Sequence, residues 1–145
     1  MIKGKFRPLT PGAAGTPEFF SPVLLGVSLS DATDNNPQHI IKSDLVTLVD
    51  TGADLCRIDT RLADSLPSLT YLGTMDQTSG NGTAKQKLYK FQILIGDVCL
   101  PVFCLTSSLR SGGSLFDLSV GMEVIRHFDL TVSRARDQVL LEWIG

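Results

Sequence analysis

The residues with the clearest chemical potential in this sequence are Leu48-Val49-Asp50-Thr51-Gly52-Ala53-Asp54. Apolar residues lead into Asp50, so its carboxylate is expected at the end of a buried strand, where it is costly unless hydrogen bonds or a function compensate. Thr51 adds a hydroxyl that can bind neighbouring backbone, Gly52 permits close approach of another backbone, and Ala53 keeps a pocket floor small. The pattern predicts a functional turn on a rigid strand.

Short strands on both sides of the turn are expected to position it. Runs of branched apolar residues predict strands over 23–29 and 44–49, and a further short strand over 55–58. A capping residue followed by apolar spacing predicts one helical turn within 59–66, which Pro67 ends.

A polar segment over 76–87 predicts a hairpin. It contains Asn81-Gly82, and both residue types tolerate positive φ in tight turns. Apolar residues then alternate from Tyr89 to Ile95, as in a half-buried strand. Taken alone, the segment is an ordinary solvent-exposed hairpin.

A second apolar segment ends in glycine at Leu118-Ser119-Val120-Gly121. Helical spacing of apolar residues follows up to Phe128, so a short C-terminal helix is expected. The chain closes with an apolar strand over 139–144, which contains Trp143. Such a strand is an exposed edge unless it pairs, and a partner subunit is expected to cover it.

Length and charge limit the classes of function. The 145 residues fit one domain with a real core, and 43% hydrophobic against 19% charged residues is typical of a globular protein. The balance of 13 basic and 15 acidic residues argues against nucleic-acid binding, for which a basic excess is expected.

The cysteines and histidines do not form a metal-ligand pattern. Cys56, Cys99 and Cys104 are odd in number and are expected to be buried free thiols, while His39 and His127 complete no zinc signature. We therefore expect no metal and no cofactor.

Prolines and glycines in residues 1–20 predict an extended N-terminal arm without regular structure, followed by one domain over 21–145. No apolar h-region of a signal peptide is visible. The most apolar stretch, Ile93 to Leu105, is interrupted by Asp97 and is too short to span a bilayer. We expect a soluble protein with no membrane segment, cytoplasmic or cut from a larger precursor.

The Asp-Thr-Gly-Ala turn resembles the active-site motif of retropepsin-like aspartic proteases, a family with one Asp-Thr-Gly per chain. The hairpin after it resembles that family's flap, and the segment ending at Gly121, about 70 residues after Asp50, resembles its apolar-apolar-Gly segment and C-terminal helix. The resemblance extends roughly from Val23 to Ile144. It implies an all-β, mainly antiparallel fold with one short C-terminal helix and one lobe per chain, which assembles as a homodimer.

The resemblance also implies roles for single residues. Asp50 of each subunit would form the catalytic pair with no cofactor, Thr51 would bond across to the partner's backbone, and Gly52 would contact an extended peptide or protein substrate. Ala53 and Asp54 would contribute to substrate binding. The hairpin tip would contribute the residues Ser79, Gly80 and Asn81.

One position departs from the family pattern. Retroviral members often carry an Arg directly after the glycine of the second segment, paired with the acid at the position of Asp54, but this sequence has Met122. Either Asp54 is unpaired or Arg126, one helical turn further on, replaces the missing cation. The Met122 form is more similar to cellular or bacterial members than to viral ones.

Three functions are compatible with the motif. The first is a homodimeric aspartic endopeptidase. The second is a dimeric peptide-binding or assembly module that has the same fold but does not turn over substrate. The third is a structural domain in which the Asp50 side chain merely caps a turn. The third leaves the Thr-Gly-Ala context and the hairpin unexplained.

Overall fold

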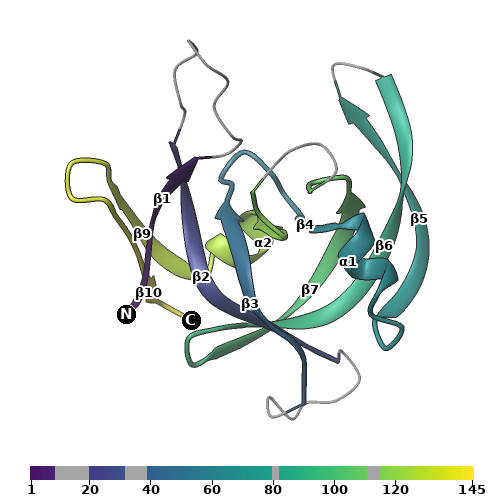
Figure 1. Cartoon of the computed structure of the whole chain (residues 1–145), viewed down its shortest axis with the longest axis horizontal. Helices are drawn as coiled ribbons and strands as arrows, with labels where there is room; N and C mark the ends of the chain where they lie inside the picture. Colours follow the sequence, from purple (N-terminus) through teal and green to yellow (C-terminus); the bar gives the residue numbers. More distant parts are fainter. Residues whose placement is uncertain (9–19, 32–38, 80–81, 111–114) are drawn as a thin grey trace.

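Strands make up most of the protein. The computed structural model describes residues 1–8, 20–31, 39–79, 82–110 and 115–145 (Figure 1). In chain order, the elements are β1 (Ile2–Pro8), β2 (Phe20–Asp31), β3 (Ile40–Val49), β4 (Cys56–Asp59), α1 (Thr60–Asp64), β5 (Thr70–Ser79), β6 (Gly82–Ile95), β7 (Val98–Ser107), β8 (Leu118–Val120), α2 (Met122–Ile125), β9 (Phe128–Ser133) and β10 (Gln138–Trp143).

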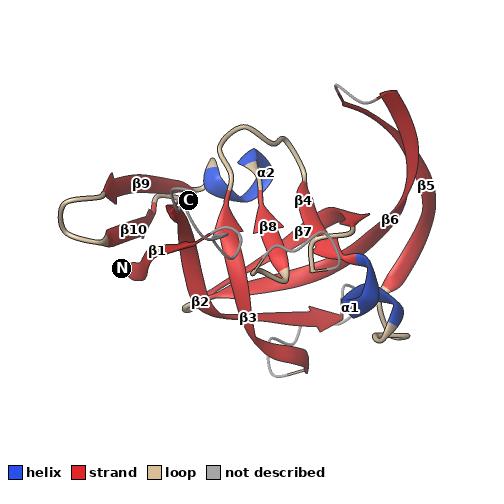
Figure 2. Cartoon of the chain, turned by 45° about the horizontal axis from the view of Figure 1, so that its top comes forward, coloured by secondary structure: helices blue, strands red, loops and turns tan. Residues whose placement is uncertain are grey.

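Six of the strands close into a barrel. The sheet order is β5-β6-β7-β4-β8-β3-β2-β1-β10-β9, and an additional pairing joins β6 to β2. Leu29 of β2 therefore stands opposite both Lys42 of β3 and Ile93 of β6. The pairing of β2 with β3 shifts register between Leu24 and Val27, next to Gly26, whose φ is +72°. Figure 2 shows β5 and β6 extending beyond the barrel at one end, with β9 and β10 at the other.

The core lies inside this barrel. Strand residues alternate between its two faces, so every second side chain points inward. Apolar side chains with at most 5% of their surface exposed come from all six barrel strands, and they include Leu24, Leu29, Leu45, Val49, Ile58, Phe91, Ile93, Val102, Leu118 and Val120. The turn after β3 thus starts from a strand that is fixed on one face by packed apolar groups.

The two chain ends differ from expectation. Residues 2–8 were expected to lack regular structure, but they form β1, which pairs with β2 and β10. The half-buried Phe6 contacts the core, and Pro8 is tolerated because β10 pairs only with residues 2–4, so that β1 is an edge strand on that side at Pro8. Residues 9–19 lie outside the described residues, and the domain boundary at residue 21 stays a prediction.

The expectation that β10 is an edge strand awaiting a partner is also wrong. It pairs with β9 on one side and with β1 on the other, and β9 is the last strand of the sheet. The strand that covers this side of β10 comes from the chain's own N-terminus, not from a second subunit.

The all-β, mainly antiparallel fold class is confirmed, and the helical turn expected within 59–66 is α1. Asp59 caps α1, since its Oδ2 accepts from the Leu62 amide at 3.4 Å. The expected C-terminal helix is reduced to α2, because β9 already begins at Phe128. No helix among the described residues is long and apolar enough to cross a membrane.

Candidate active site

Asp50 lies at the carboxyl end of β3, where two strands that are distant in sequence run parallel. Leu48 is in register with Ser119 of β8, and Val49 with Val120. The Asp50 amide continues this ladder by donating to the Val120 carbonyl at 3.0 Å. The position of Asp50 is therefore fixed by β8, a segment about 70 residues away.

The turn after Asp50 holds one oxygen of its carboxylate. The Gly52 amide donates to Asp50 Oδ1 at 3.0 Å, and the Ala53 amide donates to the Asp50 carbonyl at 3.4 Å. The Asp50 side chain is half-buried, whereas Thr51 and Gly52 are exposed. Oδ2 accepts no hydrogen bond from the residues that the structure describes. The turn thus orients the carboxylate and leaves one oxygen available to a ligand.

Gly121 lets the second segment pack directly against this turn. A Cβ at Gly121 would lie 2.6 Å from the Ala53 carbonyl oxygen and 2.7 Å from that of Leu55, closer than atoms tolerate. Because no side chain intervenes, the Met122 amide donates to Ala53 O at 2.7 Å and the Glu123 amide to Asp54 O at 2.9 Å. The resemblance to the retropepsin-like family implies close backbone packing of this segment beside the turn, and these bonds show it.

Glu123 was not singled out from the sequence, yet it connects three elements beneath the turn. Its Oε1 accepts from the Cys56 amide of β4 at 2.9 Å, and its Oε2 accepts from the Phe103 amide of β7 at 3.2 Å. Both oxygens thus support the strands that flank the site. The available signal was an acid in the first turn of a helix beside the Asp-Thr-Gly segment.

We expect Glu123→Ala to lower the free energy of unfolding by about 2 kcal/mol, because it leaves two backbone amides without their charged acceptor. Urea denaturation measures the change. Glu142→Ala is the matched control, since that side chain is exposed on β10 and its loss should change stability by less than about 0.5 kcal/mol. Equal effects of the two substitutions would contradict the role assigned to Glu123.

Asp54 and Arg126 line a shallow pocket of about 400 Å³ with Leu55, Met122 and Glu123. Within the described part of the chain, the Asp54 carboxylate and the Arg126 guanidinium form no ion pair. Of the two alternatives left open by the sequence, the unpaired Asp54 is the one observed in this chain.

The three cysteines are free thiols. Cys56 and Cys104 face each other across the parallel pair β4–β7 and are fully buried, as expected, whereas Cys99 is half-buried. Burial raises the pKa of Cys56, with a further contribution from Glu123, and burial also raises the pKa of Cys104. Both thiols therefore stay protonated, which makes them core residues and not nucleophiles.

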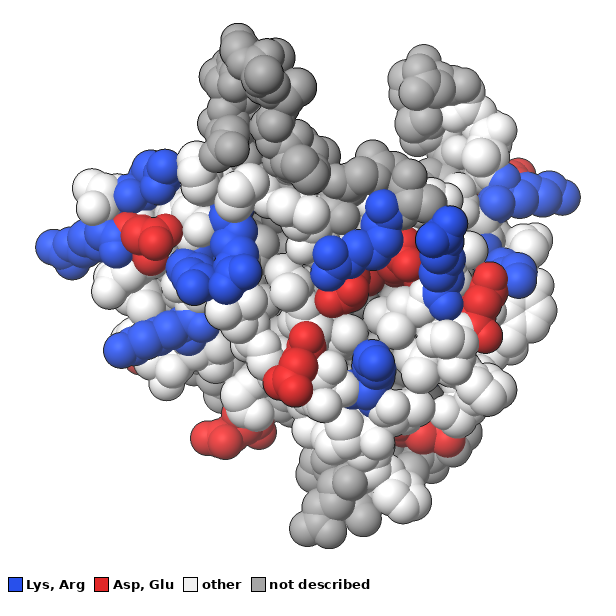
Figure 3. Space-filling model, viewed as in Figure 1, with Lys and Arg blue, Asp and Glu red and all other residues white. Residues whose placement is uncertain are grey.

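The predicted hairpin is formed by β5 and β6. Ser79 pairs with Gly82, while the side chain of Ser79 and both Gly80 and Asn81 lie outside the described residues. In Figure 1 the hairpin rises on the same side of the barrel as the loop that joins β3 to β4. On the face shown in Figure 3, basic and acidic side chains are interspersed.

Comparison with known proteins gives a fold. No protein-family model matches the chain, and no curated protein does either. Among solved structures, EIAV protease in complex with the inhibitor HBY-793 is similar at 13% identity, over 80% of this chain and 92% of that chain, with a TM-score of 0.53.

Two further structures match with TM-scores of 0.47. Simian foamy virus (mac) protease has 12% identity over 70% of this chain and 90% of that chain. A retropepsin-like aspartic protease from Rickettsia conorii has 16% identity over 87% of this chain and 96% of that chain. Only the EIAV protease match among these three has a TM-score above 0.5. Because its sequence identity is 13%, the match establishes the fold and nothing further. The chain has the retropepsin-like fold.

Proposed function

We propose that the protein is an aspartic endopeptidase that works as a homodimer. The observation that carries the proposal is the half-buried Asp50 carboxylate, which the Gly52 amide orients at the end of β3 in a retropepsin-like fold. A purely structural role, in which Asp50 caps the turn, uses only Oδ1. Oδ2 accepts no hydrogen bond from the described residues and is available to a ligand.

The chemistry requires a second carboxylate. Two carboxylates about 3 Å apart cannot both ionise cheaply, so the pair shares one proton. The ionised member takes a proton from a bound water, which attacks the peptide carbonyl, and the protonated member donates to the carbonyl oxygen. A chain with one Asp-Thr-Gly obtains the second carboxylate from a two-fold symmetric copy of itself.

The exposure of the turn supports this assembly. Thr51 and Gly52 are exposed in the single chain, where the proposed partner's equivalent turn would meet them. In the proposed dimer, the Thr51 hydroxyl bonds across the axis to the partner's backbone. Gly52, Ala53 and Asp54 bind the main chain of the substrate.

The hairpin of β5 and β6 acts as a flap in this proposal. An extended peptide between the Asp50 pair and the hairpins gains main-chain hydrogen bonds from both sides, as in other cases of strand addition. Ser79, Gly80 and Asn81, which connect the two strands in the sequence, would form the flap tip over it.

The test is incubation of the purified protein with a mixed peptide library between about pH 4 and 7. We expect internal cleavage under mildly acidic conditions, and a specific activity that rises with protein concentration until dimers predominate. Absence of cleavage at every pH, with peptides still bound, would replace the enzyme by a peptide-binding module.

A further inference from the structure

One row of side chains crosses the sheet beside Asp50. Residues in register on neighbouring strands point to the same face. Register joins Leu48 of β3 to Ser119 of β8, and Ser119 to Arg57 of β4. Arg57 is in turn in register with Leu105 of β7. Because Asp50 follows Leu48 by two residues and extends the same ladder, it shares this face.

Arg57 is an unusual member of the row, because a cation replaces an apolar residue in a barrel strand. Its neighbours Cys56 and Ile58 are fully buried on the inner face, so the half-buried Arg57 points to the outer face. Its Nη1 donates to Oε1 of Gln77 on β5. Arg57 therefore lies under the hairpin that the proposed function treats as the flap.

In the part of the chain that the structure describes, the charge of Arg57 is not balanced. Among the described residues, no carboxylate forms an ion pair with it, and its partner Gln77 is neutral. A guanidinium has five donors in a planar fork that matches a carboxylate, and one hydrogen bond to an amide leaves most of them unused. A cation that is partly removed from water is costly until an anion pairs with it.

A cavity lies at this guanidinium. It has a volume of about 380 Å³ and is lined by Arg57, Gln77, Ala84, Gln86 and Ser107. Apart from Ala84 these described lining residues are polar, and Arg57 is the one charged residue among them. In the same row as Arg57, the Ser119 side chain is 98% buried, and its hydroxyl has no hydrogen-bond partner in the described structure. That hydroxyl does not line the cavity, so the ligand is inferred from the unused guanidinium donors of Arg57, which point to a polar group that the free chain lacks.

We propose that Arg57 determines specificity by binding an acidic side chain of the peptide substrate. The proposal rests on the proposed function for the identity of the ligand as a peptide. A Glu or Asp carboxylate would pair with the guanidinium under the hairpin, while the substrate main chain passes the Asp50 turn. Because a two-fold dimer duplicates the pocket, the acidic preference holds at two positions, one on each side of the cleaved bond.

The test uses a peptide library in which each position in turn carries Glu, Gln or Lys. Binding is measured with Asp50→Asn, which needs no turnover, and cleavage with the wild type. We expect Glu peptides to bind about tenfold tighter than Gln peptides at the two preferred positions. Arg57→Met should reduce this ratio to about one, while Arg57→Lys should retain part of it.

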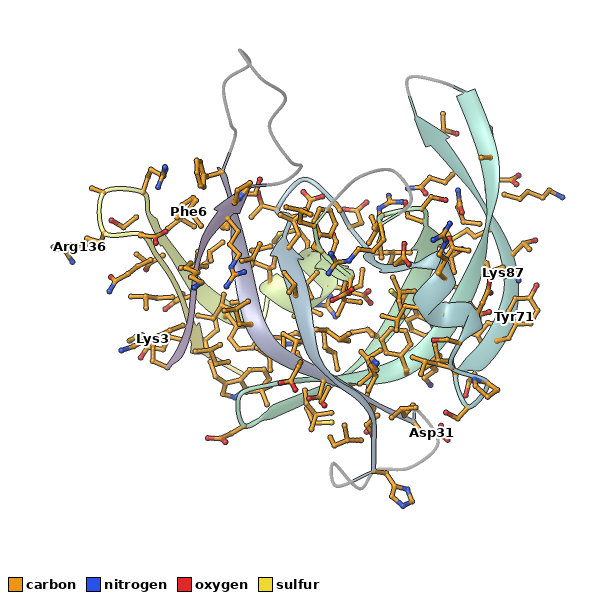
Figure 4. All side chains as sticks on the ribbon, in the orientation of Figure 1. Lys3, Phe6, Asp31, Tyr71, Lys87 and Arg136 are labelled. Atoms are coloured by element: carbon orange, nitrogen blue, oxygen red, sulfur yellow. The ribbon has the colours of Figure 1, made fainter. Side chains whose placement is uncertain are left out.

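Arg136→Met is the matched control, because Arg136 is exposed in the turn between β9 and β10, far from the hairpin (Figure 4). It should leave the ratio unchanged, and thermal unfolding checks that each variant is folded. Equal binding of Glu and Gln peptides by the folded Asp50→Asn protein, or no binding of either, would overturn the proposal. If Glu peptides bind selectively but the wild type cleaves none of them, the role of Arg57 stands and the proposed endopeptidase activity is wrong.

Discussion

Asp50→Asn is expected to lower the rate of peptide cleavage by about a thousandfold or more. The substitution replaces both carboxylates of the proposed pair with amides, which can neither take a proton from water nor donate one to the peptide carbonyl. The fold should not change, because the Asn side-chain oxygen still accepts the hydrogen bond from the Gly52 amide. Cleavage kinetics and thermal unfolding, measured on the same preparation, separate the two effects.

Asp129→Asn is the matched control for this experiment. Asp129 is exposed on β9, away from the turn, and its substitution removes the same charge without touching the site. We expect wild-type cleavage from it. If Asp50→Asn retained a large part of the activity while folded, the pair of Asp50 carboxylates could not be the catalytic group.

Gly121→Ala is expected to lower the free energy of unfolding by about 3 kcal/mol or more, more than any other substitution proposed above. The added methyl would lie 2.6 Å from the Ala53 carbonyl oxygen and 2.7 Å from the Leu55 carbonyl oxygen, and both are backbone atoms that cannot turn away. Relief of the contact would move α2 and break the bonds from Met122 and Glu123 to the turn. Cleavage should therefore fall together with stability, as urea denaturation and peptide assays can show.

Gly26→Ala is the matched control for Gly121→Ala, because it adds backbone strain without a steric clash. A Cβ at Gly26 meets nothing within 4 Å, but its φ of +72° disfavours any residue other than glycine. Its cost should be about 1 kcal/mol, from conformation alone. If Gly121→Ala were no more destabilising than Gly26→Ala, the close contact between the two segments would not be needed for the fold.

Local chemistry in the sequence predicted much of the site. The apolar lead into Asp50 and the small residues after it are required by contacts within the turn itself. The cap at Asp59 and the hairpin of β5 and β6 were visible for the same reason, because short-range hydrogen bonds determine them. The glycine at position 121 was recognised only through the family resemblance, because its contacts join segments about 70 residues apart.

The features that could not be predicted depend on pairing between distant strands. The position of Arg57 beside the candidate site could not be predicted, because it depends on the pairing of β4 with β8 and on the contact with Gln77 of β5. Glu123 reaches the Cys56 and Phe103 amides only because β4 and β7 lie side by side. The strand β1 was missed because pairing with β2 and β10 outweighed the weak local propensity of a segment rich in glycine and proline.

The central claim is that one active site needs the Asp50 of two chains. Wild type and Asp50→Asn are mixed at a constant total concentration, allowed to exchange subunits, and assayed for peptide cleavage. If both carboxylates are required, activity follows the square of the wild-type fraction, and an equal mixture retains about one quarter. An activity that falls in proportion to the wild-type fraction, about one half in the equal mixture, would mean that each chain works alone and would contradict the account.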